Sequence, residues 1–190
     1  MNFKVGEKVV YPNHGIGVIE KISNTEIAGT ANSFYHLRMK PNESQRNEST
    51  VMVPIKNAGE IGLRHPIKTA QCDMLLNVLS EDFVSPPIDW KDRYKEFVDK
   101  MKTGDIFQVA EVLKNLTFLS LSKPLSFREK RLLEKARHLV ISELAIVCRK
   151  ANCTVEAQVD TALQMCCSKH STTVSASKTG LKSARFAVVH

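Results

Sequence analysis

The spacing of apolar residues changes once along this chain, near residues 66–70, from the pattern of β-strands to that of helices. Before the change, Val, Ile, Tyr and Phe gather in short runs separated by Gly, Pro and Asn, as small antiparallel sheets require. The runs are EKVVY, IGVIEKI, SFYHLRM and TVMVP. This pattern predicts a small antiparallel β-barrel.

After the change, apolar residues recur at intervals of three and four. A first helix is expected from about residue 71, in CDMLLNVLSE, and the chain then breaks at VSPP. A second helix is expected from about residue 89. Its apolar stripe is Trp90, Tyr94, Phe97, Val98 and Met101. Taken alone, this stripe favours a core position for Trp90, the one tryptophan of the chain.

Capping residues predict where the next helices begin and end. Gly104 suits the C-cap of the second helix, and Asp105 suits the N-cap of the third. In SFRE, Ser126 and Glu129 have the spacing of a capping box at the start of a fourth helix. The fold class is therefore α+β, with a small barrel followed by a compact all-α domain.

We expect three segments: a sheet domain at 1–66, a helical domain at 67–150, and a C-terminal segment at 151–190. Within the last segment, TVEAQVDTALQMCC is typical of one more helix. The following KHSTTVSASKTG has the small polar composition of a mobile end. No function is assigned to this segment.

The net charge of +7 is concentrated in residues 88–150, which carry fourteen Lys and Arg against nine Asp and Glu. A basic segment favours a polyanionic partner such as nucleic acid. A solvated helical surface gives the same composition, so charge alone leaves both interpretations open.

Five cysteines without repeated spacing argue against a disulfide framework and favour a reducing compartment. The chain has no run of 18 apolar residues and no apolar core of a signal peptide near Met1. We therefore expect a cytoplasmic protein with no membrane partner.

The motifs of the common enzyme classes are absent from the sequence: there is no Gly-rich phosphate loop, nucleophile elbow or H-E-x-x-H. We expect no catalytic residue and no cofactor. Cys153, Cys166, Cys167 and His170 are of the types that bind zinc, but adjacent cysteines rarely satisfy tetrahedral geometry, so no metal is expected. His14, in YPNHG, is interpreted as a turn residue rather than a catalytic one.

Five separated segments agree in order and spacing with one family. They are FKVGEKVVYPNHGIGVIEKI at 3–22, VPIKNAGEIGLR at 53–64, DWKDRYK at 89–95, GDIFQVAEVLKNL at 104–116 and LSFREKRLLEKARHLVISELA at 125–145. On these residues the chain resembles the CarD/CdnL family of bacterial transcription regulators. The resemblance covers residues 3–145 and ends near 150.

The resemblance implies a non-enzymatic, monomeric regulator, associated with the nucleoid through RNA polymerase. Its Tudor-like N-terminal domain would bind the β1 lobe of the polymerase β subunit, in the holoenzyme with the principal sigma factor. The tryptophan at position 90 would enter the minor groove of promoter DNA near the upstream edge of the −10 region. Neighbouring basic residues would hold phosphates, and the open promoter complex would be stabilised.

Carried over by position, the resemblance implies two sets of site residues. The DNA-binding set is Trp90, Arg93, Lys95, Lys130, Arg131, Lys135 and Arg137. The polymerase-binding set is Thr25, Met52 and Pro54.

The sequence departs from the family pattern at three positions. Relatives can carry arginines where this chain has Thr25 and Met52, and they often carry a basic residue where it has Asp92. An inserted polar loop at 42–49 is expected to lie in solvent or to alter the polymerase contact. The alternative function is an interaction module that binds polymerase or a repair factor and whose helical domain makes no DNA contact.

Overall fold

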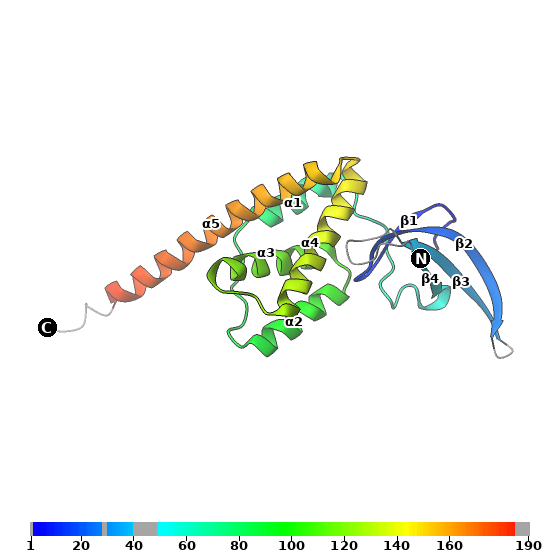
Figure 1. Ribbon diagram of the computed structural model, residues 1–190, viewed down its shortest axis with the longest axis horizontal. Coiled ribbons are helices and arrows are strands. Elements are labelled where there is room, and N and C mark those ends of the chain that lie inside the picture. The colour runs from blue at the N-terminus through cyan, green and yellow to red at the C-terminus, as the bar shows by residue number, and fades with distance from the viewer. Residues whose placement is uncertain (1, 28–29, 40–48, 185–190) are drawn as a thin grey trace.

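The computed structural model describes residues 2–27, 30–39 and 49–184 of the chain. Within them an N-terminal sheet is followed by α-helices (Figure 1). The strands are β1 (Lys8–Tyr11), β2 (Gly15–Ile27), β3 (Thr30–Met39) and β4 (Ser49–Pro54). The helices are α1 (Cys72–Ser80), α2 (Trp90–Lys102), α3 (Ile106–Ser122), α4 (Phe127–Cys148) and α5 (Asn152–Ala184), with short 3-10 turns η1 (Ile55–Asn57) and η2 (Thr69–Gln71). This order confirms the predicted α+β class.

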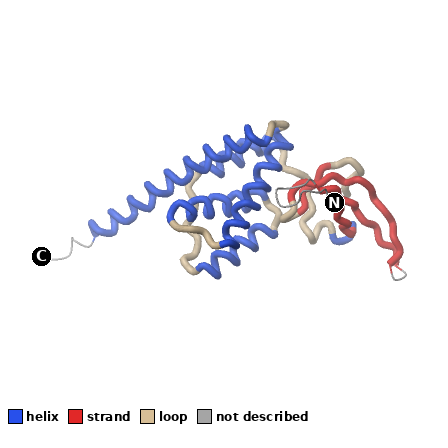
Figure 2. Tube along the Cα trace, viewed as in Figure 1, coloured by secondary structure: helices blue, strands red, loops and turns tan. Residues whose placement is uncertain are grey.

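The four strands pair in chain order, each antiparallel to its neighbour. Strands and helices occupy opposite ends of the molecule (Figure 2). β2 continues to Ile27, past the expected end at Ile22, because Ser23, Asn24 and Thr25 also pair with β3. Polar residues in a paired strand leave no apolar signal, so this extension escaped prediction.

One face of the sheet carries the core of the N-terminal domain. Its buried residues are Phe3, Val9, Ile19, Tyr35, Leu37, Met39, Val53, Ala58 and Leu63. Tyr35 and Val53 lie opposite each other in the register of β3 and β4, so their side chains point to the same face. The side chains that alternate with these point to the opposite face of the sheet.

A second core lies among the helices, and the predicted caps hold their ends. The Asp89 side chain accepts a hydrogen bond from the Lys91 backbone N–H, and Asp105 accepts one from Phe107. Ser126 and Glu129 form both bonds of the expected capping box. Gly104 has φ +72°, a conformation that side chains disfavour, where α2 gives way to α3. The predicted helix starts are confirmed.

α5 packs against α1 and then extends beyond the other helices (Figure 1). Val155, Val159 and Leu163 bury their side chains in the helical core. The helix continues to Ala184, through the stretch after Lys169 whose composition is typical of a mobile end. Small polar residues also allow a helix when its preceding turns are anchored by packing.

The described residues bear on three further expectations: the inserted loop, a membrane span and a zinc site. Residues 42–48 of the inserted polar loop lie outside it. No helix in the described ranges has the length and apolar character needed to cross a bilayer. The four residues of zinc-binding type lie in different surroundings. Cys153 is exposed, Cys166 and Cys167 are buried, and His170 bonds to Asp82 and Ser85.

Candidate functional site

The three residues expected to contact polymerase lie on one face of the sheet, opposite its core. In the register, Met52 pairs with His36, Pro54 pairs with Phe34, and Thr25 pairs with Asn32. These positions alternate with the core-facing Tyr35 and Val53, so they share the outer face. We call this face, formed by Ser23, Thr25, Phe34, His36, Met52 and Pro54, the sheet surface.

The sheet surface contains an exposed methionine and, next to it, a buried histidine that hydrogen-bonds to a serine. Met52 exposes 51% of its surface, and Thr25 is also exposed. Beside them His36 is buried, and its Nε2 lies 2.7 Å from the Ser23 hydroxyl. The structure therefore brings the predicted polymerase residues together on one face, which also carries the exposed Arg38, two residues after His36.

The turn between β1 and β2 docks onto the helical domain. Pro12 is buried between two glycines with positive φ: a Cβ on Gly104 would lie 2.7 Å from Pro12 Cγ, and one on Gly62 would lie 3.1 Å from it. His14 is exposed in the turn and stacks on Tyr11, as expected of a turn residue. The YPNHG motif therefore joins the two domains.

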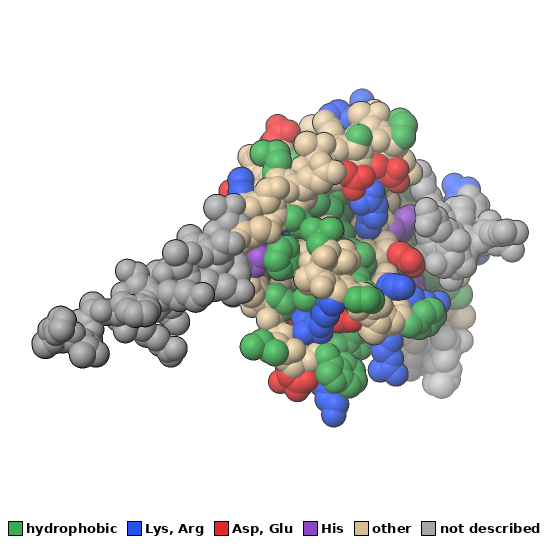
Figure 3. All heavy atoms as spheres, turned by 60° about the vertical axis from the view of Figure 1, so that its left-hand side comes forward, with side chains coloured by type: hydrophobic (Ala, Val, Ile, Leu, Met, Phe, Trp, Pro, Cys, Tyr) green, Lys and Arg blue, Asp and Glu red, His purple; other side chains and the backbone are tan. Residues whose placement is uncertain are grey.

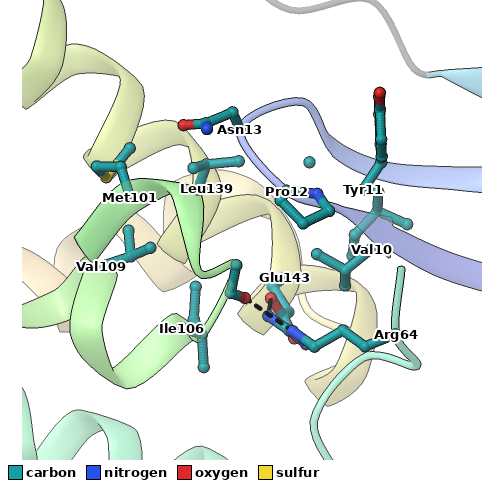
Figure 4. Close-up of a pocket in the computed structure, with 13 residues that line it drawn as sticks. Val10, Tyr11, Pro12, Asn13, Arg64, Met101, Ile106, Val109, Leu139 and Glu143 are labelled. Atoms are coloured by element: carbon teal, nitrogen blue, oxygen red, sulfur yellow. Dashed lines mark hydrogen bonds and ion pairs between the residues drawn. The ribbon is translucent and has the colours of Figure 1, made fainter. Parts of the chain in front are cut away.

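An ion pair at this junction ties the sheet domain to α4 (Figure 4). Arg64 donates from both terminal nitrogens to Glu143, at 2.7 and 2.9 Å, and from Nε to the Gly104 carbonyl at 2.8 Å. Glu143 is only 2% exposed and also accepts from the Ile67 backbone N–H. The junction leaves a cavity of about 10 Å³, roughly the room for one water-sized sphere.

Trp90 is the first residue of α2, and 57% of its surface is exposed. Phe97 and Met101, further along the same stripe, are buried in the helical core. The core interpretation therefore holds for the later turns of α2 and not for Trp90. The Lys91 ammonium lies 5.8 Å from the centre of the indole ring, so a cation accompanies the exposed aromatic.

Arg93 is placed differently from the prediction of a phosphate contact. It is 3% exposed and donates to Glu129 at 3.0 Å and to the carbonyls of Pro87 and Ile88 at 3.1 and 3.2 Å. A guanidinium buried in this way cannot reach a phosphate without breaking an ion pair, which corrects the expected role. Its observed role is to brace the chain before Trp90 against α4.

Glu129 completes this brace at the start of α4. Its carboxylate accepts from the Ser126 backbone and hydroxyl as well as from Arg93. Burial acts to raise the pKa of Glu129, but these hydrogen bonds outweigh it and hold the pKa below its usual value. The starts of α2 and α4 are thereby joined, one turn from Trp90.

Sequence reasoning missed one exposed aromatic beside this brace. Phe127, two residues before Glu129, exposes 73% of its surface, and the Arg131 guanidinium lies 5.3 Å from its ring centre. Lys95, Arg128 and Lys130 are exposed as well. The capping box gives the one signal in the sequence, since it places Phe127 in the first turn of the helix, directly after the Ser126 N-cap.

We call the surface formed by Trp90, Lys91, Phe127, Arg128, Lys130 and Arg131 the helix-end surface. Hydrophobic side chains lie exposed among basic ones on this side of the helical domain (Figure 3). Such a mixture is what a partner with charged and aromatic parts, such as a nucleic acid, would contact.

The remaining predicted basic residues lie further along α4. Lys135 is two turns after Phe127 on the same side of the helix, and burial lowers its pKa. Its charge also lowers the pKa of His14, after the larger effect of burial, so Lys135 lies near the β1–β2 turn. Arg137 is directed elsewhere, because it forms a two-armed ion pair with Asp160 of α5.

Asp92 is exposed in the first turn of α2, next to the helix-end surface. A carboxylate there interacts favourably with the unpaired N–H groups of the helix start, which explains it structurally. Toward a phosphate the same charge is repulsive. Asp92, where we expect this chain to differ from the family pattern, therefore lies at the edge of the helix-end surface and would weaken phosphate binding there.

Comparison with known proteins covers both domains. Residues 3–67 match a family model described as the CarD-like/TRCF RID domain, and residues 74–160 match one described as the CarD C-terminal domain. A curated relative from Bacillus subtilis (strain 168), named "Putative transcription factor YdeB", is 31% identical over 145 residues. The alignment covers 76% of this chain and 92% of the relative.

Proposed function

Because this chain belongs to the CarD family of transcription factors, we propose that it binds RNA polymerase and stabilises promoter DNA in its opened state. The sheet domain contacts the β1 lobe of the β subunit, in the holoenzyme with the principal sigma factor. The helical domain contacts DNA near the upstream edge of the −10 region. The protein acts by binding and catalyses no reaction.

The polymerase contact is made by the sheet surface. Met52 is exposed, and its position opposite His36 puts it on the same face as Pro54 and Thr25. Burying one methionine side chain contributes about 1.5–3 kcal/mol. Lys21, opposite His36, and Arg38, two residues after His36 on β3, are exposed on the same face. The contact therefore combines apolar burial of Met52 with charge at its edge, and its affinity is expected to fall moderately as salt rises.

The observation that carries the proposed DNA contact is the exposed indole of Trp90 on a braced helix start. A flat aromatic at the junction between duplex and melted strands occupies a distorted base step. Unstacking such a step costs a few kcal/mol, and polymerase has already opened it. An aromatic contact with a base is worth about 1–3 kcal/mol, which shifts an equilibrium roughly 5- to 150-fold.

Phosphate contacts around the indole come from exposed cations of the helix-end surface and its flanks. Lys130 and Arg131 lie on α4, and Lys95 lies on α2. Lys135 serves as an outer contact near the domain junction. Arg137 reaches a phosphate only by leaving Asp160, which makes it the weakest member of the proposed set. These contacts position the domain and do not read sequence.

A substitution on the sheet surface tests the polymerase contact. Met52→Asp places a charge in the proposed interface and is expected to abolish retention of polymerase on the immobilised protein. Met74→Asp on α1 is the matched control, because Met74 is similarly exposed but lies on the helical domain. Equal retention by both variants would contradict the proposed contact.

Reactivity of unpaired thymines in the promoter tests the DNA contact. Trp90→Ala is expected to reduce the opened fraction while polymerase retention stays unchanged. The alternative function, in which the helices only orient the sheet domain, predicts equal opening with both proteins. Salt-independent binding of the full chain to forked promoter DNA would also favour that alternative, since phosphate contacts release counterions.

A further inference from the structure

The second half of α5 lies beyond the matched family residues, yet it touches the chain that leads to Trp90. This chain is the connection 81–89 between α1 and α2. Lys169 donates to the Ser80 carbonyl at 2.9 Å, at the end of α1. The next residue, His170, bonds to two residues of the connection.

His170 is 4% exposed and contacts residues of the connection and of α3. Its Nδ1 lies 2.5 Å from the Asp82 carboxylate, and its Nε2 lies 3.1 Å from the Ser85 hydroxyl. Its ring stacks on Phe83 with centroids 4.1 Å apart, and Phe118 of α3 meets it edge-on at 4.7 Å. Three of the first five residues of the connection therefore contact one side chain.

A second lysine, on α3, also binds the end of α1. Lys114 of α3 is buried and donates to the Val78 carbonyl at 2.7 Å, and its ammonium lies 6.0 Å from the Phe83 ring. Cations near the last carbonyls of a helix interact favourably with its dipole. The end of α1 is thus fixed from both α3 and α5, and α5 also supplies the His170 contacts to Asp82 and Ser85.

Beyond Ser85 the connection has little freedom before the indole. Pro86 and Pro87 restrict the backbone, and the Pro87 and Ile88 carbonyls accept from Arg93. The chain is therefore tethered at Asp82 and Ser85 by α5 and at its other end by Arg93. Loss of the first tether removes the bonds of α5 to Asp82 and Ser85 and leaves Phe83 packed against Phe118 and Lys114.

We propose that His170 and Lys169 are positioning residues: through them α5 holds the connection 81–89 and thereby fixes the pose of Trp90. The consequence for DNA rests on the proposed function of Trp90, whereas the tether itself does not. Hydrogen bonds within proteins typically contribute enough that losing one changes a local equilibrium about two- to tenfold. Loss of both His170 bonds is expected to raise the detached population of the connection by at least that factor.

The single tryptophan makes this tether measurable in the full-length protein. Fluorescence anisotropy decay of Trp90 reports its local motion on the nanosecond scale. His170→Ala is expected to add a fast component and to speed amide hydrogen exchange in residues 82–89 by about two- to tenfold. His170→Gln, which can donate and accept, is expected to restore part of the slow motion.

Two further variants separate the tether from the folding of α5. Asp82→Asn and Ser85→Ala change the connection and leave the buried α5 residues Val159, Leu163 and Cys166 in place. Both are expected to loosen Trp90 while helix content is unchanged. Gln164→Ala, at an exposed position of α5, is the matched control and is expected to match the original protein. Unchanged anisotropy and exchange in His170→Ala, Asp82→Asn and Ser85→Ala would overturn the proposal.

Open-complex lifetimes separate this inference from the proposed function. If both hold, His170→Ala shortens the lifetime less than Trp90→Ala does, and polymerase binding is retained. If Trp90→Ala has no effect on the lifetime, the DNA role fails while the mobility results still support the tether. If Trp90→Ala shortens the lifetime but His170→Ala changes neither mobility nor lifetime, the tether is wrong and the DNA role stands.

Discussion

Arg64 and Glu143, 79 residues apart in sequence, form a two-armed ion pair across the junction of the two domains. The sheet surface lies on one side of this pair and the helix-end surface on the other. A wedge can act on DNA only at a defined distance from the polymerase that carries it. The pair, together with Pro12 packed against Gly104, supplies the fixed geometry that the proposed function needs.

Arg64→Ala is expected to destabilise the protein, because it leaves the buried Glu143 carboxylate without its ionic partner. Removing one member of a buried pair costs about 3–5 kcal/mol, and the partial exposure of Arg64 favours the lower end. Urea unfolding measures the change. Arg38→Ala, which breaks a more exposed pair with Glu20, is the control and should cost about 0–1 kcal/mol. Equal losses in the two variants would contradict a structural role for the junction pair.

The brace between Arg93 and Glu129 predicts a pH dependence. The pKa of Glu129 is lowered in the folded protein, so its stabilising contribution is present above its unfolded value of about 4.3 and is lost as pH falls through the folded value. Glu129→Gln should remove that part of the acid sensitivity. Stability measured from pH 6 down to pH 3 should fall less steeply in this variant. Parallel curves for the two proteins would show that the brace does not contribute.

The thiols are expected to differ widely in reactivity. Burial raises the pKa of Cys72 to about 12 and that of Cys166 to about 11, so their thiolate populations are negligible at pH 8. Cys153 is exposed at the start of α5. Cys167 is buried, and Cys148 is partly buried against the helical core. Cys153 should therefore react with maleimide first, and Cys153→Ser should abolish that fastest reaction. Rapid labelling of Cys72 or Cys166 would show that the helical core opens readily.

Asp92 offers a gain-of-function test on the helix-end surface. Asp92→Arg replaces a repulsive charge with a phosphate ligand and is expected to tighten binding to forked promoter DNA several-fold. Neutralising one more phosphate should also steepen the salt dependence by about one unit of slope. Asp92→Asn removes the repulsion without adding a contact and should give an intermediate affinity. Weaker binding by Asp92→Arg would contradict a DNA contact at this surface.

Local signals in the sequence predicted much of the fold. The Asp105 cap and the Ser126–Glu129 box are contained within four residues of chain, so their geometry follows from spacing alone. The polymerase-binding set rests on the family resemblance; the two-residue period of a strand adds only that Met52 and Pro54 share one face. The extent of α5 did not follow, because a small polar composition leaves no apolar period to mark where the helix ends.

The site was less predictable where its geometry depends on distant partners. Arg93 looked like a phosphate ligand, but Glu129, 36 residues later, buries it. Arg137 likewise pairs with Asp160, 23 residues later. Periodicity could not decide whether Trp90 is exposed, since one stripe contains both the buried Phe97 and the first-turn indole. Basic residues on a helix have the same pattern whether they face solvent, a carboxylate or DNA.

The lifetime of preformed open complexes after addition of a DNA competitor measures the proposed action of Trp90 on opened DNA. Polymerase holoenzyme is assembled on a promoter with the original protein, with Trp90→Ala, or with Met74→Ala as a control for exposed apolar area. We predict that the original protein and Met74→Ala prolong the lifetime equally, and that Trp90→Ala shortens it by roughly 5-fold or more while still binding polymerase. An unchanged lifetime with polymerase-bound Trp90→Ala would contradict the account.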